Sequence, residues 1–306
     1  MKSNLIRIVL TTITIMLTIT GCIRGTTNPI EHTSESMTII DSLGRKLELT
    51  KKPNRVVCLS PAATEIVAAL MTDNIIVGRT EYCNYPEEIT SIATVGDMVQ
   101  PSIESIVGLA PDLVISTTSM NEETLKKLDE LQIPNVLIYE RESFEGTYNT
   151  IQKIGVVIGE EEKARKIVVA MHKEVSDITN RLKNIEEKPR VYYMVGFGES
   201  GDFTAGGDTF IHQIIELGKG ENIAKHTKGW SYSLEQIVAN DPDIIIAPDY
   251  VAVETLKKTP VYQDLRAVKE NKVFLINEDI ISRQGPRIAE GLRVMAKALH
   301  ADIDFE

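Results

Sequence analysis

Apolar residues along this chain fall into short continuous runs separated by stretches of helical periodicity. Continuous apolar runs are typical of strands buried on both faces of a parallel sheet. Between them, apolar residues recur every three or four positions, as in a helix with one buried face. The alternation predicts an α/β fold in which helices cover parallel sheets. The runs that predict strands lie at 55–59, 75–78, 135–139, 190–195 and 273–276, with two more inside a repeated stretch.

That repeated stretch is a helix-and-strand unit that occurs twice. Residues 102–115 read SIESIVGLAPDLVI, and residues 233–246 read SLEQIVANDPDIII. Each copy begins with a Ser that can cap a helix, continues for one or two helical turns, breaks at Pro-Asp and ends in an apolar run. The repeat predicts two similar, Rossmann-like lobes.

The stretch between the two copies is helical in pattern and unusually long. Apolar residues recur at helical spacing over 144–158 and again over 160–187, and Pro189 is expected to end the second helix. A coiled-coil oligomer is the alternative, but the apolar stripe is too short for several heptads. We therefore expect a monomer in which one rigid helix crosses from lobe to lobe.

These patterns divide the chain after residue 36 into three segments. An N-terminal α/β lobe is expected over 37–143, and it begins with a short hairpin around the Asp-Ser-Leu-Gly turn of 41–44. Connecting helices, including the inter-lobe helix, follow over 144–187. A C-terminal α/β lobe is expected over 188–306.

Residues 1–36 differ in composition from the rest of the chain. Two basic residues precede an apolar run at 8–19 that is too short to span a bilayer comfortably and is placed like a signal-peptide core. Small residues directly before Cys22 resemble the lipobox of bacterial and archaeal lipoproteins. We expect a lipoprotein signal peptide over 1–21, lipidation of Cys22 and a flexible, polar tether over 22–36. A plain secretory peptide is the alternative.

Composition and charge exclude several classes of function. With 42% apolar and 25% charged residues the chain is a soluble globular protein, and a formal charge of −11 gives no basic surface for nucleic acid. Besides Cys22 the chain has two cysteines, Cys58 and Cys83. Their number and spacing suggest neither a disulfide framework nor a metal site, so we expect two unpaired, partly buried thiols.

No catalytic constellation emerges from the motifs. The five histidines are far apart in sequence, and neither a nucleophile elbow nor a phosphate-binding loop is present. The glycines of 196–201 match the dinucleotide fingerprint formally, but 202–207 separate them from the next helix, so we reject that match. Ser60 and Pro61 form a helix start directly after a strand, which could hold an anion or serve only as a cap. We predict that the protein binds no metal or cofactor and has no enzymatic activity.

Loops that follow the predicted strands carry aromatic and ion-pairing side chains instead. Because binding residues of open α/β sheets lie beyond the strands' carboxyl ends, these loops should open on a common side. Such a set suits a large, partly apolar ligand with polar arms. The candidate ligand residues are Tyr82, Phe203, Trp230, Asp279 and Arg283.

Several motifs together resemble one protein family. They are the lipobox, RVVCLSPAATE at 55–65, YCNYP at 82–86, both repeat copies and SRQGPR at 282–287. In these the chain resembles the substrate-binding proteins of ABC importers for cobalamin, haem and iron-siderophore chelates, and most closely the cobalamin binders. The resemblance implies a class III periplasmic-binding-protein fold, in which two Rossmann-like lobes with parallel sheets are joined by one long rigid α-helix with little hinge closure.

The resemblance also implies roles for single residues. The five candidate ligand residues fall where cobalamin-binding relatives contact the corrinoid. Glu104 and Glu235 occupy the same place in the two repeat copies, where relatives present carboxylates to arginines of the permease. An early-helix acid favoured by the helix macrodipole is the alternative for each. Met98 and Thr117 stand where relatives with a Trp-rich pocket carry aromatics.

The sequence thus predicts an extracytoplasmic receptor, lipid-anchored at the outer face of the cytoplasmic membrane. It would capture cobalamin or a related corrinoid in the cleft between lobes and deliver it to an ABC permease dimer with its cytoplasmic ATPase. An iron-siderophore or haem receptor of the same family is the first alternative. A metal-dependent enzyme or redox protein on a related two-lobed fold is the second, and a docking lipoprotein without a small ligand is the third.

Overall fold

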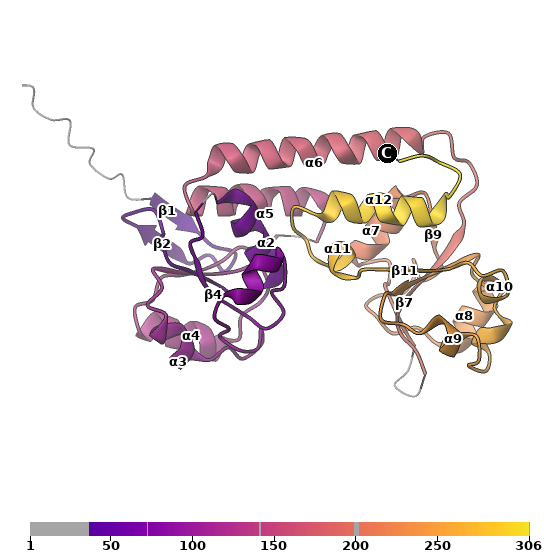
Figure 1. Ribbon diagram of the computed structural model, residues 1–306, viewed down its shortest axis with the longest axis horizontal. Coiled ribbons are helices and arrows are strands. Elements are labelled where there is room, and N and C mark those ends of the chain that lie inside the picture. Colours follow the sequence, from indigo (N-terminus) through magenta and orange to yellow (C-terminus); the bar gives the residue numbers. More distant parts are fainter. Residues whose placement is uncertain (1–36, 72, 141, 199–201, 306) are drawn as a thin grey trace, which may run out of the picture. The chain divides into compact units, whose positions relative to one another are not determined.

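Two parallel sheets organise the chain after residue 36, which forms one compact unit. The computed structural model describes residues 37–71, 73–140, 142–198 and 202–305, and Figure 1 shows their arrangement. The expected signal peptide, the lipidation site Cys22 and the tether lie outside these residues. We call the part around the first sheet the N-terminal lobe and the part around the second the C-terminal lobe.

The sheet of the N-terminal lobe has four parallel strands. Their order is β4-β3-β5-β6, and each predicted apolar run supplies one of them. β3 and β5 are fully buried because helices cover both faces of the sheet. The strands are β3 (Val56–Cys58), β4 (Ile76–Arg79), β5 (Leu113–Ser116) and β6 (Asn135–Leu137), and the predicted hairpin precedes them as β1 (Met37–Ile40) and β2 (Lys46–Leu49).

The sheet of the C-terminal lobe repeats this order. β9, β7, β10 and β11 are parallel neighbours in that sequence, as β4, β3, β5 and β6 are in the first sheet. One strand departs from the expected parallel pattern, because β8 pairs antiparallel with the end of β7. The strands are β7 (Arg190–Gly196), β8 (Phe203–Thr204), β9 (Glu221–Asn222), β10 (Ile244–Pro248) and β11 (Val273–Ile276).

The repeated stretch forms the same structure in both lobes. Ser102 and Ser233 cap α3 (Ile103–Gly108) and α8 (Leu234–Asn240), as predicted, and each helix leads into the central strand of its sheet. The Pro-Asp breaks have a structural purpose. Asp112 accepts the backbone N–H of Arg55 at 2.8 Å, and Asp243 accepts that of Arg190 at 2.8 Å. Asp112 thereby links the start of β5 to the start of β3, and Asp243 links the start of β10 to the start of β7.

Helices cover the sheets and connect the two lobes. In the N-terminal lobe they are α2 (Pro61–Leu70), α4 (Glu122–Glu130), α5 (Phe144–Val157) and the 3-10 helix η1 (Glu87–Ser91). In the C-terminal lobe they are α7 (Phe210–Leu217), α9 (Val253–Leu256), α10 (Arg266–Lys269), α11 (Asp279–Ser282), α12 (Ile288–Leu299) and the 3-10 helix η2 (Tyr262–Asp264).

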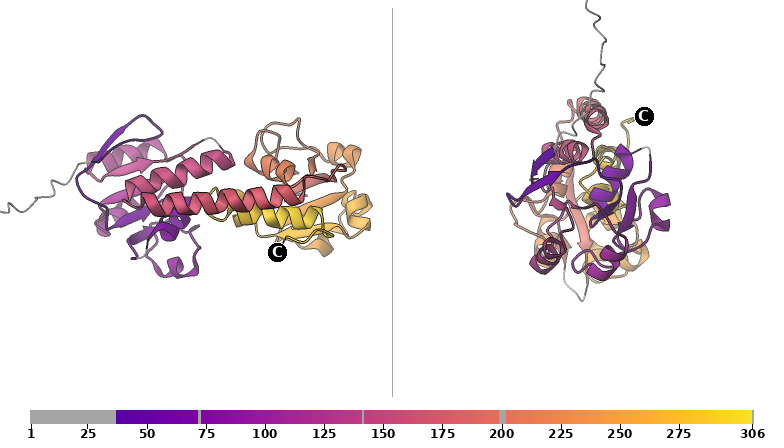
Figure 2. Two further views of the ribbon diagram at one scale, coloured as in Figure 1. Left: turned by 90° about the horizontal axis from the view of Figure 1, so that it is seen from above. Right: turned by 90° about the vertical axis from the view of Figure 1, so that its left-hand side faces the viewer.

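The long helix α6 (Glu161–Arg181) packs on α5 at one end and on α12 at the other, as Figure 2 shows. Its buried stripe joins one hydrophobic cluster that contains residues of both lobes. The helix ends at Arg181, six residues before the predicted end at 187. Leu182 is the last residue of the apolar stripe, and 183–188 add only Ile185, so packing no longer stabilises another turn.

Candidate functional site

A cavity of about 330 Å³ opens where the strands of the N-terminal lobe end. Loops after all four strands contribute to its wall, which is the position where open α/β sheets bind ligands. The final loop of the C-terminal lobe closes it from the other side. The lining residues are Pro61, Ala62, Tyr82, Met98, Thr117, Thr118, Tyr139, Glu140, Glu142, Thr150, Asp279, Ser282, Arg283 and Gln284.

The candidate ligand residues fall into two groups. Tyr82, Asp279 and Arg283 meet in this cavity, and Met98 and Thr117 line it too. Phe203 and Trp230 lie on two segments that run side by side, because Thr204 donates its N–H to the carbonyl of Trp230 at 2.8 Å. Both aromatic side chains are partly exposed, Phe203 by 37% and Trp230 by 47%. The structure therefore places three candidates in one wall and the two aromatic residues on a neighbouring loop pair.

A second cavity, of about 610 Å³, adjoins the first. It shares Tyr139 and Glu142 with the first cavity and continues to Gly207 and Asp208 in the C-terminal lobe. Asp208 accepts the N–H of Gly229, the residue before Trp230, at 2.8 Å. We call the two adjoining cavities the inter-lobe cleft. A ligand larger than the first cavity can extend along this cleft to Asp208, whereas neither Phe203 nor Trp230 lines it.

A glycine makes this loop arrangement possible. A side-chain carbon on Gly207 would lie 1.9 Å from the carbonyl oxygen of Lys225, so only glycine allows the two backbones to approach this closely. The sequence did not indicate that this loop pairs with the segment at 225–230. Pairing of these segments sets Phe203 opposite Ser231 and Thr204 next to Trp230.

Ser60 has a different role from the one its position suggested. Its hydroxyl makes no capping hydrogen bond to α2, although Pro61 does open that helix. Instead it accepts the N–H of Thr117 at 3.0 Å and shares a hydrogen bond with the Thr117 hydroxyl at 2.8 Å. The side chain thus ties the ends of β3 and β5 together at the floor of the first cavity.

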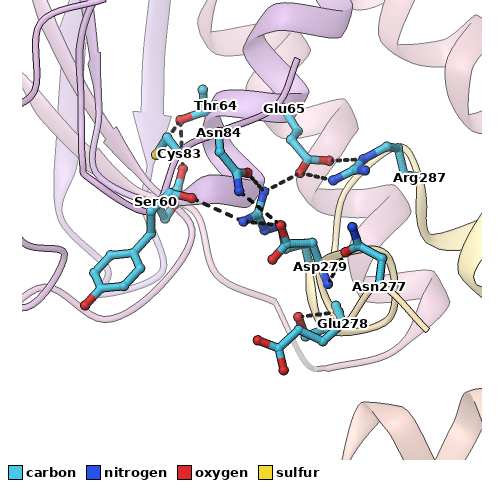
Figure 3. A network of polar contacts seen from close by, with 12 residues as sticks. Ser60, Thr64, Glu65, Cys83, Asn84, Asn277, Glu278, Asp279 and Arg287 are labelled. Atoms are coloured by element: carbon cyan, nitrogen blue, oxygen red, sulfur yellow. Dashed lines mark hydrogen bonds and ion pairs between the residues drawn. The ribbon is translucent and has the colours of Figure 1, made fainter. Parts of the chain in front are cut away.

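Arg283 lies at the centre of a network that crosses between the lobes, shown in part in Figure 3. Its Nη1 donates to Glu65 at 3.1 Å and to the Asn84 side chain at 2.7 Å. Its Nη2 donates to the carbonyl of Tyr82 at 3.2 Å and pairs with Asp279 at 2.7 Å. Asn84 also donates to Asp279 at 3.3 Å. Three of these partners belong to the N-terminal lobe.

Glu65 anchors this network from α2 of the N-terminal lobe. Its side chain is only 2% exposed, and both oxygens accept from Arg287, at 2.6 and 2.9 Å. The ring of Tyr85 stacks on the Arg287 guanidinium at 3.7 Å. The sequence analysis did not include Glu65 or Arg287 among the candidate site residues. The available signal was that Glu65 is the only charged residue of an otherwise apolar helix, and a buried carboxylate requires partners.

The wall of the first cavity carries more negative than positive charge. Among the residues that the structure describes, Glu140, Glu142 and Asp279 face it with a single guanidinium, that of Arg283. Glu140 is paired with Lys153, so Glu142 is the acid with no ion pair among the described residues. Burial and the neighbouring Glu142 carboxylate raise the pKa of Tyr139. The site thus offers hydrogen-bond acceptors and aromatic surface in preference to free cations.

The docking candidates Glu104 and Glu235 are exposed in the first turns of α3 and α8, and neither lines the inter-lobe cleft. Neither forms an ion pair with any residue that the structure describes. Hydrogen bonds from its own backbone and from Ser233 hold the pKa of Glu235 below its ordinary value. Figure 1 shows both helices on the side of their sheets away from α6.

The two remaining cysteines are unpaired, as predicted, but fully buried rather than partly buried. The Cys83 sulfur accepts a hydrogen bond from Thr64 at 3.0 Å, and burial raises the pKa of the Cys58 thiol. Within the described ranges no group of histidine, cysteine or acidic residues could hold a metal ion. No helix in the same ranges is long and apolar enough to cross a membrane.

The fold and the site define a class of protein: a two-lobed binding protein with a ligand cleft between its lobes. The family of periplasmic binding proteins matches residues 56–280. The chain belongs to this family, which confirms the resemblance seen in the sequence, and its two sheets and long helix are those of the class III fold.

Three comparisons are informative. The chain is 30% identical to the uncharacterised ABC transporter substrate-binding lipoprotein YvrC of Bacillus subtilis (strain 168), over 87% of this chain and 86% of the relative. It is 28% identical to a cobalamin-binding protein of Halobacterium salinarum (strain ATCC 29341 / DSM 671 / R1), over 85% and 73%. The periplasmic heme-binding protein RhuT from Roseiflexus sp. RS-1, in apo form, has the same fold, with a TM-score of 0.75 at 22% identity over 81% and 98%.

These relatives fix the general role. Substrate-binding proteins of ABC transporters hold small ligands and work with a permease and an ATPase, and they are not enzymes. Family members act outside the cytoplasm, as the name periplasmic binding protein states.

Proposed function

We propose that this protein captures cobalamin or a related corrinoid in the inter-lobe cleft and delivers it to an ABC permease. The observation that carries the proposal is the cleft itself, which continues from an acceptor-rich wall at Asp279 to Gly207 and Asp208 in the C-terminal lobe. A corrinoid is a large, partly apolar macrocycle with many amide arms. It exceeds the first cavity of about 330 Å³ and would extend along the cleft.

The charge of the wall supports a corrinoid over an anionic ligand. Amide arms donate N–H groups, which the carboxylates of Asp279 and Glu142 can accept. Haem carries two carboxylates, and many ferric chelates are anionic, so both need cations in the wall. Among the described residues of the wall Arg283 is the only guanidinium, and it is already paired with Glu65 and Asp279. Stacking on Trp230, Phe203 and Tyr82 would supply the apolar contact.

A haem or ferric-chelate receptor is the second candidate, and the feature that favours it is Tyr82. Its side chain is 53% exposed and lines the first cavity, where a phenol oxygen could ligate iron. The Tyr82 hydroxyl also donates a hydrogen bond to the Asp97 carboxylate at 3.4 Å.

Trp230 provides the direct test because it is the only tryptophan. Its fluorescence is followed while purified protein is titrated with cyanocobalamin, and separately with haemin and ferric citrate. Saturable quenching by cyanocobalamin at micromolar concentration, competed weakly by the iron compounds, is expected. Absence of saturable binding would sink the corrinoid proposal. Saturation by haemin alone, with an absorption band typical of phenolate ligation that Tyr82→Phe removes, would establish the second candidate.

Delivery would use one exposed carboxylate from each lobe. We propose that Glu104 and Glu235 contact arginines on the two subunits of a permease dimer, with Cys22 as the lipid anchor of a monomeric receptor. Charge reversal of both acids should lower cobalamin uptake by cells about tenfold or more, because like charges would then face each other. Soluble ligand affinity should not change.

Glu145 offers a matched control for that experiment. It is also an exposed acid in the first turn of its helix, but it lies on α5. If Glu145→Arg lowers uptake as much as Glu104→Arg and Glu235→Arg do, the effect reflects the helix macrodipole and the docking proposal fails. A fall in soluble affinity would instead place the two glutamates in the ligand site. Secretion of the Cys22→Ala protein into the medium would support the anchor.

A further inference from the structure

Arg283 faces the first cavity, yet its terminal N–H groups are already matched by acceptors. A guanidinium carries four terminal N–H groups, two on each terminal nitrogen. Nη1 has two acceptors, Glu65 and Asn84, and Nη2 has two, the Tyr82 carbonyl and Asp279. The side chain is 11% exposed. An anionic ligand that paired with Arg283 would have to displace one of these partners.

Glu65 is the partner that a ligand cannot displace. Its carboxylate is 2% exposed, lies behind Arg283, and is held at both oxygens by Arg287. Arg287 is itself held from outside by the Tyr85 ring. Burial alone would lower the pKa of Arg287, but its bonds and attraction to Glu65 raise that pKa overall, so the group keeps its charge. The acid therefore has a fixed position and two cationic partners.

The charges of this network balance. Glu65 and Asp279 supply two negative charges, and Arg283 and Arg287 supply two positive ones. Removing the charge of Glu65 would leave one positive charge of the network uncompensated next to the cavity wall. Charge-assisted pairs are strong in such partly dehydrated surroundings. A carboxylate brought in by a ligand could then take the place of the lost partner.

We propose that Glu65 is a specificity-determining residue: it neutralises Arg283 from behind and thereby makes the cavity reject anionic ligands. Glu65 does not touch the ligand and acts through Arg283, so it is a positioning residue. The inference rests on the proposed function only in that a corrinoid-sized ligand occupies the cleft.

A test with two ligands of equal shape isolates charge from packing. Cyanocobalamin is uncharged overall, and mild hydrolysis converts corrin side-chain amides to carboxylates, giving cobalamin carboxylic acids of nearly the same size. Both affinities are measured by Trp230 fluorescence for the intact protein. The wild-type protein should bind the acid about tenfold or more weakly than cyanocobalamin. Equal affinity for the two ligands would overturn the inference and leave the proposed function standing, whereas binding of neither would remove the proposed function.

Glu65→Gln then tests the residue itself. This variant keeps the shape and one acceptor oxygen but removes the charge, so the affinity ratio of the two ligands should fall by about tenfold through tighter binding of the acid. Arg287→Gln is the matched control. It breaks the same network but leaves Glu65 to neutralise Arg283, so the affinity for the cobalamin carboxylic acid should not rise.

A purely structural role for Glu65 predicts a different result. In that case both variants would weaken both ligands alike and leave the ratio unchanged, which would overturn the inference. If Glu65→Gln does not fold, the comparison of the two ligands on wild-type protein still decides whether the cavity rejects anions.

Discussion

The two lobes share one sheet order, but the segments that follow their opening strands differ. In the N-terminal lobe β3 leads at once into α2, and Ser60 ties that junction to β5 through Thr117. In the C-terminal lobe the antiparallel strand β8 stands between β7 and α7. The same framework thus builds a wall of the cleft in one lobe and an antiparallel loop pair with two exposed aromatic residues in the other. The lobes are equivalent as scaffolds and unequal as binding surfaces.

Substitutions in the network around Glu65, which links the two lobes, should have the largest effect on stability. Glu65→Ala would leave two arginines without their buried partner, and breaking such a pair costs about 3–5 kcal/mol. Urea unfolding should show this loss of stability for the whole unit. Glu122→Ala is the control, because Glu122 is exposed in the first turn of α4 and should change stability by less than about 0.5 kcal/mol. A loss of under about 1 kcal/mol for Glu65→Ala would show that the pair contributes little.

The loop pair of the C-terminal lobe should be the next most sensitive feature. Gly207→Ala places a carbon against the Lys225 carbonyl, and we expect a cost of about 2–3 kcal/mol together with a shift in Trp230 emission. Gly108→Ala is the comparison in the N-terminal lobe. Nothing lies within 4 Å of that position, and alanine should be neutral or slightly stabilising there. Unchanged emission in the Gly207 variant would mean that the segments around Gly207 and Lys225 separate without changing the environment of Trp230.

Substitution of the repeat's aspartates should instead have the same effect on stability in both lobes. Asp112→Asn and Asp243→Asn each weaken bonds to the backbone of an opening strand, at a cost of about 1–2 kcal/mol in either lobe. Although burial opposes it, hydrogen bonding and the charges of Arg190 and Arg266 lower the pKa of Asp243.

A lowered pKa fixes the direction of the pH dependence for Asp243. The carboxylate's contribution is fully present above its ordinary pKa of 3.8 and is lost as the pH falls through the lower folded value. The stability difference between wild type and Asp243→Asn, measured by urea unfolding, should therefore shrink below pH 4. A difference that grows with acidification would contradict this assignment.

The buried thiols should give the smallest effect. Because Cys58 and Cys83 are inaccessible and burial raises the pKa of Cys58, a thiol reagent should label neither in the folded protein and both in urea. A variant without Cys22 keeps the count unambiguous. Rapid labelling of either cysteine without urea would show that the N-terminal lobe opens locally more often than its packing suggests.

Much of the scaffold could be predicted because its signals are local. The apolar runs became strands, Ser102 and Ser233 became caps, and the repeat became the central unit of each sheet. Three local predictions were wrong in part, and each for a tertiary reason. Ser60 bonds to Thr117 instead of capping α2, α6 ends when its apolar stripe ends, and β8 reverses direction to pair with β7.

The sequence by itself determined the class of fold, the family and a set of candidate residues, because periodicity, caps and motifs are properties of neighbouring residues. Only the tertiary structure decided which candidates share a wall. It joined Glu65 to Arg283 and Arg287 across more than two hundred positions, and paired the loop of Phe203 with that of Trp230. Partners so distant in sequence leave no mark in either segment, because their attraction arises only after folding has removed water and brought the charges within bonding distance.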